Sequence, residues 1–180
     1  MDKSDARRYL EIYLTDHAAA AAGGVERARS TARALAGSPE GDRLQGLADD
    51  IAADRGALLS IMKSLGIPVR QYKVLAVRAG ELAGRLKFNG RLRERSPLTD
   101  LVEFEALRLG VEGKAACWRA LAALTDQEPA LDADELALLQ DRAQAQIDLL
   151  ERLRKAAVDE VFRGRAGRPS STPASAERPG

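Results

Sequence analysis

The stretch from Ser96 to Leu124 constrains the fold more than any other part of the chain. It begins Ser96-Pro97-Leu98 and then runs to Leu124 without another proline. A serine followed by a proline is typical of a helix start. The serine hydroxyl accepts a hydrogen bond from a first-turn N–H, and the proline needs no such partner. This stretch therefore predicts one long helix.

Two separate apolar faces run along this helix. The first comprises Leu98, Val102, Ala106, Leu109, Ala116 and Leu124, and the second comprises Phe104, Leu107, Val111 and Trp118. A helix with two apolar faces is normally covered on both sides. Because aromatic residues are favoured in buried interface cores, we expect a homodimer contact through Phe104, Leu107 and Trp118. The alternative is that Leu75, Leu82 and Leu86 of a shorter helix cover this face within one chain.

The same local signals predict the other helices. The first begins near Ser4 and ends at Gly37, and the second opens at Ser38-Pro39 and ends at Gly66. The last begins at Asp132, where Glu135 stands at capping-box spacing, and ends around Arg163. A shorter helix is expected from about Gln71 to Leu86. Inside the first helix, Gly23-Gly24 costs helix stability, about 1 kcal/mol per glycine relative to alanine, which is tolerable if a neighbouring backbone packs tightly there.

Composition supports an all-α class with one domain. Hydrophobic residues make up 45% of the 180 residues, but aromatic residues only 4%. A core of alanine, leucine and valine favours closely packed helices, and no convincing alternating strand pattern occurs. We expect a helical bundle domain over residues 1–163. Residues 164–180 lack apolar periodicity and predict a disordered tail.

Charge restricts the partners. The net charge of +1 gives no global attraction for nucleic acid or for an anionic membrane. No stretch is long and apolar enough for a signal peptide or a membrane span, so a cytoplasmic location is expected. The segment from Arg70 to Arg95 is locally basic. It is either an anion or nucleic-acid patch or a solvated connector, and the absence of aromatic interleaving for base stacking favours the connector.

The order of elements, a long hairpin, a crossover of about thirty residues with a short helix, and a second long hairpin, resembles the ferritin-like superfamily. The resemblance covers about Asp5 to Arg163 and extends to bacterial proteins of that general type. It implies a four-helix bundle of two antiparallel hairpins whose second and third long helices run parallel. Members that oxidise or store iron carry Glu-x-x-His motifs. Here the only histidine is His17, with Leu14 three positions before it, so that motif is absent.

Polar residues interrupt several apolar seams. His17 lies between Leu14 and Ala21, and Asp54 lies between Ile51 and Leu58. The interrupting or flanking residues that we expect to form a buried polar network are His17, Asp50, Asp54, Glu105 and Arg154.

Two hypotheses explain them. In the first, His17 and Asp54 form an internal pair that fixes the register of the helices, which would raise the pKa of His17. In the second, His17, Asp54 and Glu112 bind a divalent metal, since imidazole and carboxylate suit zinc, manganese or iron. We favour the pair, because a lone seam histidine is usually satisfied by a hydrogen bond.

No motif for nucleophilic catalysis or phosphate binding occurs. The chain contains no nucleophile elbow, no glycine-rich phosphate loop and no second histidine. Its one cysteine, Cys117, has apolar neighbours and reads as an inert packed thiol. The sequence thus predicts a non-catalytic ferritin-like bundle without a cofactor that acts through self-association or a protein partner. The alternative is a divergent metal-binding carrier or oxidase.

Overall fold

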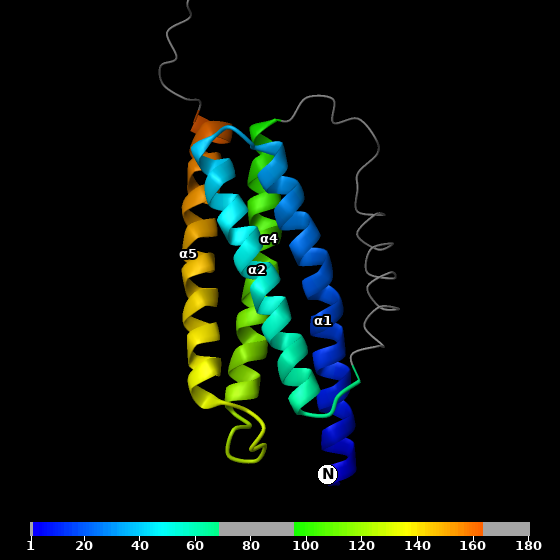
Figure 1. The fold of residues 1–180 in the computed structure, drawn as a ribbon. Helices are drawn as coiled ribbons and strands as arrows, with labels where there is room; N and C mark the ends of the chain where they lie inside the picture. The colour runs from blue at the N-terminus through cyan, green and yellow to red at the C-terminus, as the bar shows by residue number, and fades with distance from the viewer. Residues whose placement is uncertain (1, 69–95, 164–180) are drawn as a thin grey trace, which may run out of the picture.

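The computed structural model describes residues 2–68 and 96–163, which form four α-helices (Figure 1). They are α1 (Lys3–Ala34), α2 (Pro39–Ser64), α4 (Pro97–Ala122) and α5 (Ala133–Arg163). No strand occurs in these two described ranges, so the all-α prediction is confirmed for them. The predicted short helix near Gln71, the basic segment and the C-terminal tail lie outside the described residues.

The turn between α1 and α2 is built from short-range signals. Gly37 adopts a positive φ of 84°, which a residue with a side chain rarely adopts. Ser38 Oγ then accepts a hydrogen bond from the Gly41 N–H at 3.1 Å and caps α2. Gly41 is buried against the preceding turn, and a Cβ at this position would overlap the Leu35 carbonyl. The predicted boundary between the first two helices is confirmed.

The other helix starts follow the same chemistry. Ser96 Oγ accepts from the Thr99 N–H at 3.4 Å, and Pro97 occupies the first turn of α4. Asp132 Oδ1 accepts from the N–H groups of Asp134 and Glu135, at 2.8 Å and 3.0 Å, and opens α5. Each side chain satisfies first-turn N–H groups that have no partner within the helix.

The four helices form two antiparallel hairpins, α1 with α2 and α4 with α5 (Figure 1). Between the hairpins, α1 contacts α4 and α2 contacts α5. Arg27 pairs with Glu103 near the start of α4, and Arg7 pairs with Glu128 beyond its end, so α1 and α4 run in opposite directions. Consequently α2 and α4 lie on a diagonal of the bundle and run the same way.

One apolar core extends through all four helices. The α4 residues that belong to this core identify the face of α4 that points inward. Phe104, Leu107 and Trp118 are buried inside the chain, with Trp118 only 1% exposed. The predicted homodimer contact through these three residues is therefore corrected, because the face is covered by the chain's own helices. The other apolar face is the one that remains exposed.

None of the helices between residues 2 and 68 or between 96 and 163 is both long and apolar enough to cross a bilayer.

Candidate functional site

A buried carboxylate lies at the centre of the bundle. Asp54 takes a seam position of α2 and is 0% exposed. Lys114 on α4 donates a hydrogen bond to its Oδ2, and Gln146 Nε2 on α5 donates to the same oxygen at 3.0 Å. Lys114 also donates to Gln146 Oε1. Arg142 Nε on α5 lies 2.6 Å from Asp54 Oδ1, at an angle too bent for a hydrogen bond. We call these four residues the Asp54 cluster.

The Asp54 cluster carries a net positive charge, because one carboxylate faces two cations. Burial lowers the pKa of the Lys114 ammonium, and the Asp54 carboxylate offsets part of that effect. Gln146 uses its oxygen and its nitrogen at once, which no apolar side chain of the same size can do. The cluster therefore joins three helices by directional contacts.

His17 lies apart from this arrangement. It is half-buried on α1, and its ring packs edge-on against Tyr13 with a centroid distance of 4.5 Å. Burial lowers the pKa of the imidazole below its ordinary value, while Asp16 acts weakly in the opposite sense. The predicted His17–Asp54 pair is thus corrected. The Asp54 carboxylate is held by Lys114 and Gln146 instead.

The predicted metal ligands are not gathered. Glu112 on α4 forms an ion pair of 3.4 Å with Arg108, one turn earlier on the same helix. Within residues 2–68 and 96–163 no three side chains of His, Cys, Asp or Glu are grouped in a way that would hold a metal ion. The metal hypothesis for His17, Asp54 and Glu112 loses its geometric support.

The remaining members of the predicted network belong to a different place. Arg154 makes two hydrogen bonds of 2.8 Å with Glu151 on α5, and its Nη1 lies 3.9 Å from Glu105 on α4. The Arg154 hydrogen bonds lower the pKa of Glu151 to about 2. Asp50 and Glu105 are exposed. Glu105, Glu151 and Arg154 thus line the α4–α5 surface, whereas Asp50 lies on α2 and its charge acts on Lys114 of the Asp54 cluster.

Sequence analysis missed Lys114, Arg142 and Gln146. Gln146 offered a usable signal, because it lies three residues after Ala143 and four before Leu150, on the seam of α5. Lys114 offered a weaker signal. It borders the apolar face of α4, and a periodicity count scores it as a polar surface residue although its long aliphatic stem can be buried.

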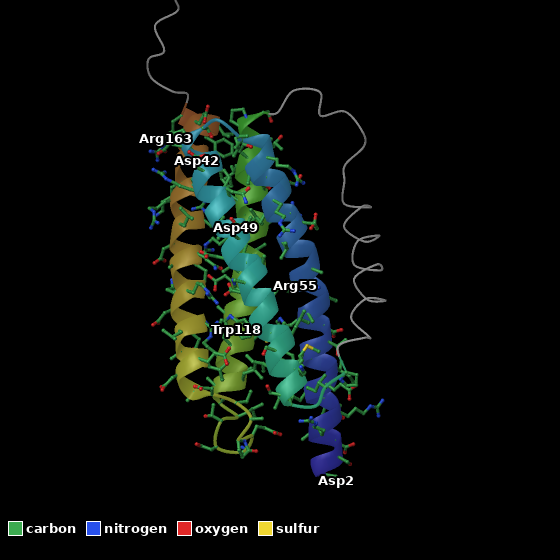
Figure 2. The ribbon with its side chains drawn as sticks, in the orientation of Figure 1. Asp2, Asp42, Asp49, Arg55, Trp118 and Arg163 are labelled. Carbon is green, nitrogen blue, oxygen red and sulfur yellow. The ribbon has the colours of Figure 1, made fainter. Side chains whose placement is uncertain are left out.

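A cavity of about 320 Å³ adjoins the Asp54 cluster between α1, α2 and α4. Asp54 and Lys114 line it together with His17 and Trp118. Trp118 is labelled in Figure 2. The Trp118 indole N–H is buried and has no hydrogen-bond partner among the described residues. Gly24 also lines this cavity, and a Cβ there would meet no atom within 4 Å. Among the described residues, no neighbouring backbone packs closely against Gly23 or Gly24.

Comparisons with protein-family models, with curated proteins and with solved structures gave no match. The resemblance to the ferritin-like superfamily rests on the layout of the helices.

Proposed function

We propose that this chain is a non-catalytic, ferritin-like helical bundle that works by binding, first of all to a second copy of itself. The observation that carries this proposal is the exposed apolar row on α4. Leu98, Val102 and Leu109 are 51%, 50% and 71% exposed. They lie on α4, which packs against both α5 and α1 through its other face. Ala116 and Ala120 continue the row and are exposed too.

The spacing of this row suits a two-fold contact between copies. Val102 and Ala116 stand seven residues on either side of Leu109, and Leu98 and Ala120 stand eleven. If two α4 helices pack antiparallel with Leu109 at the centre, the two Leu109 side chains meet each other, and Leu98 and Val102 each face an alanine of the partner. A two-fold contact needs such self-complementarity, and alternating large and small residues interdigitate well. A second copy is therefore the occupant we propose.

The chemistry of the polar groups supports binding over catalysis. Burial raises the pKa of the Cys117 thiol to about 12, so this sulfur stays protonated and unreactive near neutral pH. The Asp54 carboxylate is engaged by Lys114 and Gln146 and lies 0% exposed. Held in this way, the carboxylate is a structural group rather than a base.

The ferritin-like part of the proposal is supported by helix directions. Two antiparallel hairpins, with α2 and α4 running the same way, give the order expected for that superfamily. A shared topology supports a fold type, and the function must be argued from the surface.

Charge-swap variants test the two-fold contact. Val102→Glu and Ala116→Lys should each shift the protein from dimer to monomer in size-exclusion chromatography with light scattering. Together in one chain they should restore the dimer, because residue 102 of one copy faces residue 116 of the other. Within a chain these residues are about 21 Å apart along α4 and cannot pair.

Leu138→Glu is the matched control, since Leu138 is 70% exposed on α5 and lies outside the proposed contact. This variant should leave the dimer intact. A wild-type protein that stays monomeric at tens of micromolar would overturn the proposal. If Val102→Glu then lowered the unfolding temperature, the row would be covered by the chain's own residues 69–95.

A further inference from the structure

The cavity between α1, α2 and α4 exists because side chains are missing from its walls. Gly24 on α1 and Gly110 and Gly113 on α4 line it, and a Cβ at any of the three would meet no atom within 4 Å. Its volume of about 320 Å³ is many times the 10–15 Å³ or so that one water needs, and it falls in the range of small-ligand pockets.

Most of the cavity wall is apolar. Leu58 on α2 and Leu107 and Val111 on α4 line it and are buried. Apolar surfaces that face an unfilled space lose the dispersion contacts that close packing provides. A hydrocarbon group of suitable size would restore these contacts.

One end of the cavity is polar. Lys114 and Trp118 are four residues apart on α4, so their side chains are neighbours one turn apart on the same face. Trp118 is 1% exposed, and its buried indole N–H has no partner among the described residues. A buried donor without a partner is unfavourable, so a ligand that brings a hydrogen-bond acceptor to this N–H would be stabilised here.

The same end favours a negative acceptor. An ammonium has three N–H donors, and the two hydrogen bonds described for Lys114 go to Asp54 and Gln146. Lys114 on the cavity wall and Arg142 behind it face the single buried carboxylate of Asp54. The other carboxylate that acts on Lys114, Asp50, is exposed to solvent. From Leu107 to Trp118 the cavity follows about 16 Å of helix, which leaves room for an elongated molecule.

We propose that this cavity binds one free amphiphilic carboxylate, such as a medium-chain fatty acid. The carboxylate accepts hydrogen bonds from Trp118 Nε1 and Lys114 Nζ, and the hydrocarbon chain lies against Leu58, Leu107 and Val111. The ligand enters between α1 and α4, where Ala20 and Gly110 are exposed on the rim. Leu109, the centre of the proposed contact between copies, lines the cavity, whereas Val102 and Ala116 do not, so variants at Val102 and Ala116 test the dimer without changing the cavity wall.

Trp118 is the only tryptophan of the chain, so its fluorescence reports on the site directly. Titration of the full chain with monomeric decanoate should change the emission of Trp118 saturably, with one site per chain by calorimetry. Decanol and decyltrimethylammonium have the same chain without the negative head group. Each should bind at least tenfold more weakly. Equal binding of decanol would overturn the proposed role of the head group.

Variants at glycines locate the ligand. Gly24→Leu fills the cavity from α1 without removing any contact of the Asp54 cluster, and it should abolish decanoate binding. Gly46→Leu is the matched control, because Gly46 is exposed on α2, its added Cβ also meets no atom, and it does not line the cavity. If Gly24→Leu did not fold by circular dichroism, Gly110→Leu on α4 would serve instead.

Trp118→Phe keeps an aromatic ring and removes the indole donor. Calorimetry should show decanoate binding about tenfold weaker, as expected for one lost hydrogen bond to a charged acceptor. The proposal is overturned if wild-type protein shows no saturable binding, or if Gly24→Leu binds as tightly as Gly46→Leu. Repeating the titration on the Val102→Glu variant separates this result from the oligomeric state.

Discussion

Lys114 forms an ion pair with Asp54 across the diagonal of the bundle, between α4 and α2. The two helices belong to different hairpins, and each has its main contacts with its own hairpin partner. A directional contact at this place fixes how far one hairpin can slide or rotate against the other. Leucine and alanine pairs alone tolerate several registers, because apolar contacts have no direction. The ion pair thus provides a buried, directional contact that helps to specify the register, beside the surface pair Arg27–Glu103.

Removing one partner of the pair should cost far more than removing both. Lys114→Met should lower the free energy of unfolding by about 3–5 kcal/mol. The buried Asp54 carboxylate would then keep only the partly exposed Arg142 as a cationic partner. Asp54→Leu combined with Lys114→Met should recover most of that loss. Urea unfolding followed by circular dichroism measures both effects.

A surface pair provides the control for this experiment. Arg29→Ala removes an exposed ion pair with Glu26 on α1 and should change the free energy of unfolding by less than about 0.5 kcal/mol. A double variant as unstable as the sum of Asp54→Leu and Lys114→Met would mean that the two residues do not interact in the fold.

Two glycines of α2 should respond in opposite directions to alanine. Gly41→Ala places a methyl group on the Leu35 carbonyl and should destabilise by about 1–3 kcal/mol, because the turn has no room to move. Gly46→Ala adds a methyl group in open space on an exposed helix and should stabilise by up to about 1 kcal/mol. Thermal unfolding of the pair under one condition measures the contrast. Equal effects would contradict the close turn.

The helix ends were predictable from the sequence because their causes are local. Ser38, Ser96 and Asp132 each cap a helix by bonding to N–H groups two or three residues away. Gly37 ends the first hairpin helix through its own φ. Such features depend on neighbours in the chain, so a single sequence contains the whole explanation.

The candidate site was only half predictable, because it depends on how the helices rotate. The seam position of Asp54 indicated a buried carboxylate, and the structure places it there. Its partners lie 60 and 92 residues away, and nothing local selects Lys114 and Gln146 over His17. The two apolar faces of α4 presented the same difficulty. The face with Trp118 and Phe104 turns inward, which buries more apolar area than the face with Leu98 and Val102 would.

The carboxyl group of Glu151 should remain ionised well below its ordinary pKa of 4.5. Its hydrogen bonds with Arg154 lower its pKa from the ordinary 4.5 to about 2. Because the folded-state pKa is the lower one, this contribution to stability is present above pH 4.5 and is lost as pH falls toward 2. NMR titration of the Glu151 carboxyl carbon should show the depressed midpoint. Arg154→Gln should raise it, whereas Arg152→Gln on the same helix should leave it unchanged.

Titration of His17 distinguishes the half-buried histidine of the structure, whose pKa is lowered, from the predicted His17–Asp54 pair, which would raise that pKa. Burial lowers the pKa of His17 below 6.5 in the folded state, and the nearby Asp16 reduces the shift without reversing it. Between the folded and unfolded pKa values the unfolded chain binds more protons, so stability rises with pH in that window. The stability linked to His17 is therefore complete above about pH 6.5 and falls on acidification.

Unfolding measured from pH 7.5 to pH 5 should show this loss, and His17→Gln should flatten it, because glutamine does not titrate. The ring protons of His17 give the midpoint directly by NMR, and their shifts also report the contact with Tyr13. A midpoint above 6.5, with stability that increases on mild acidification, would mean that a carboxylate holds the imidazolium. If that carboxylate were Asp54 and not the neighbouring Asp16, Asp54 would have to leave Lys114, and the register of the two hairpins would differ from the one described.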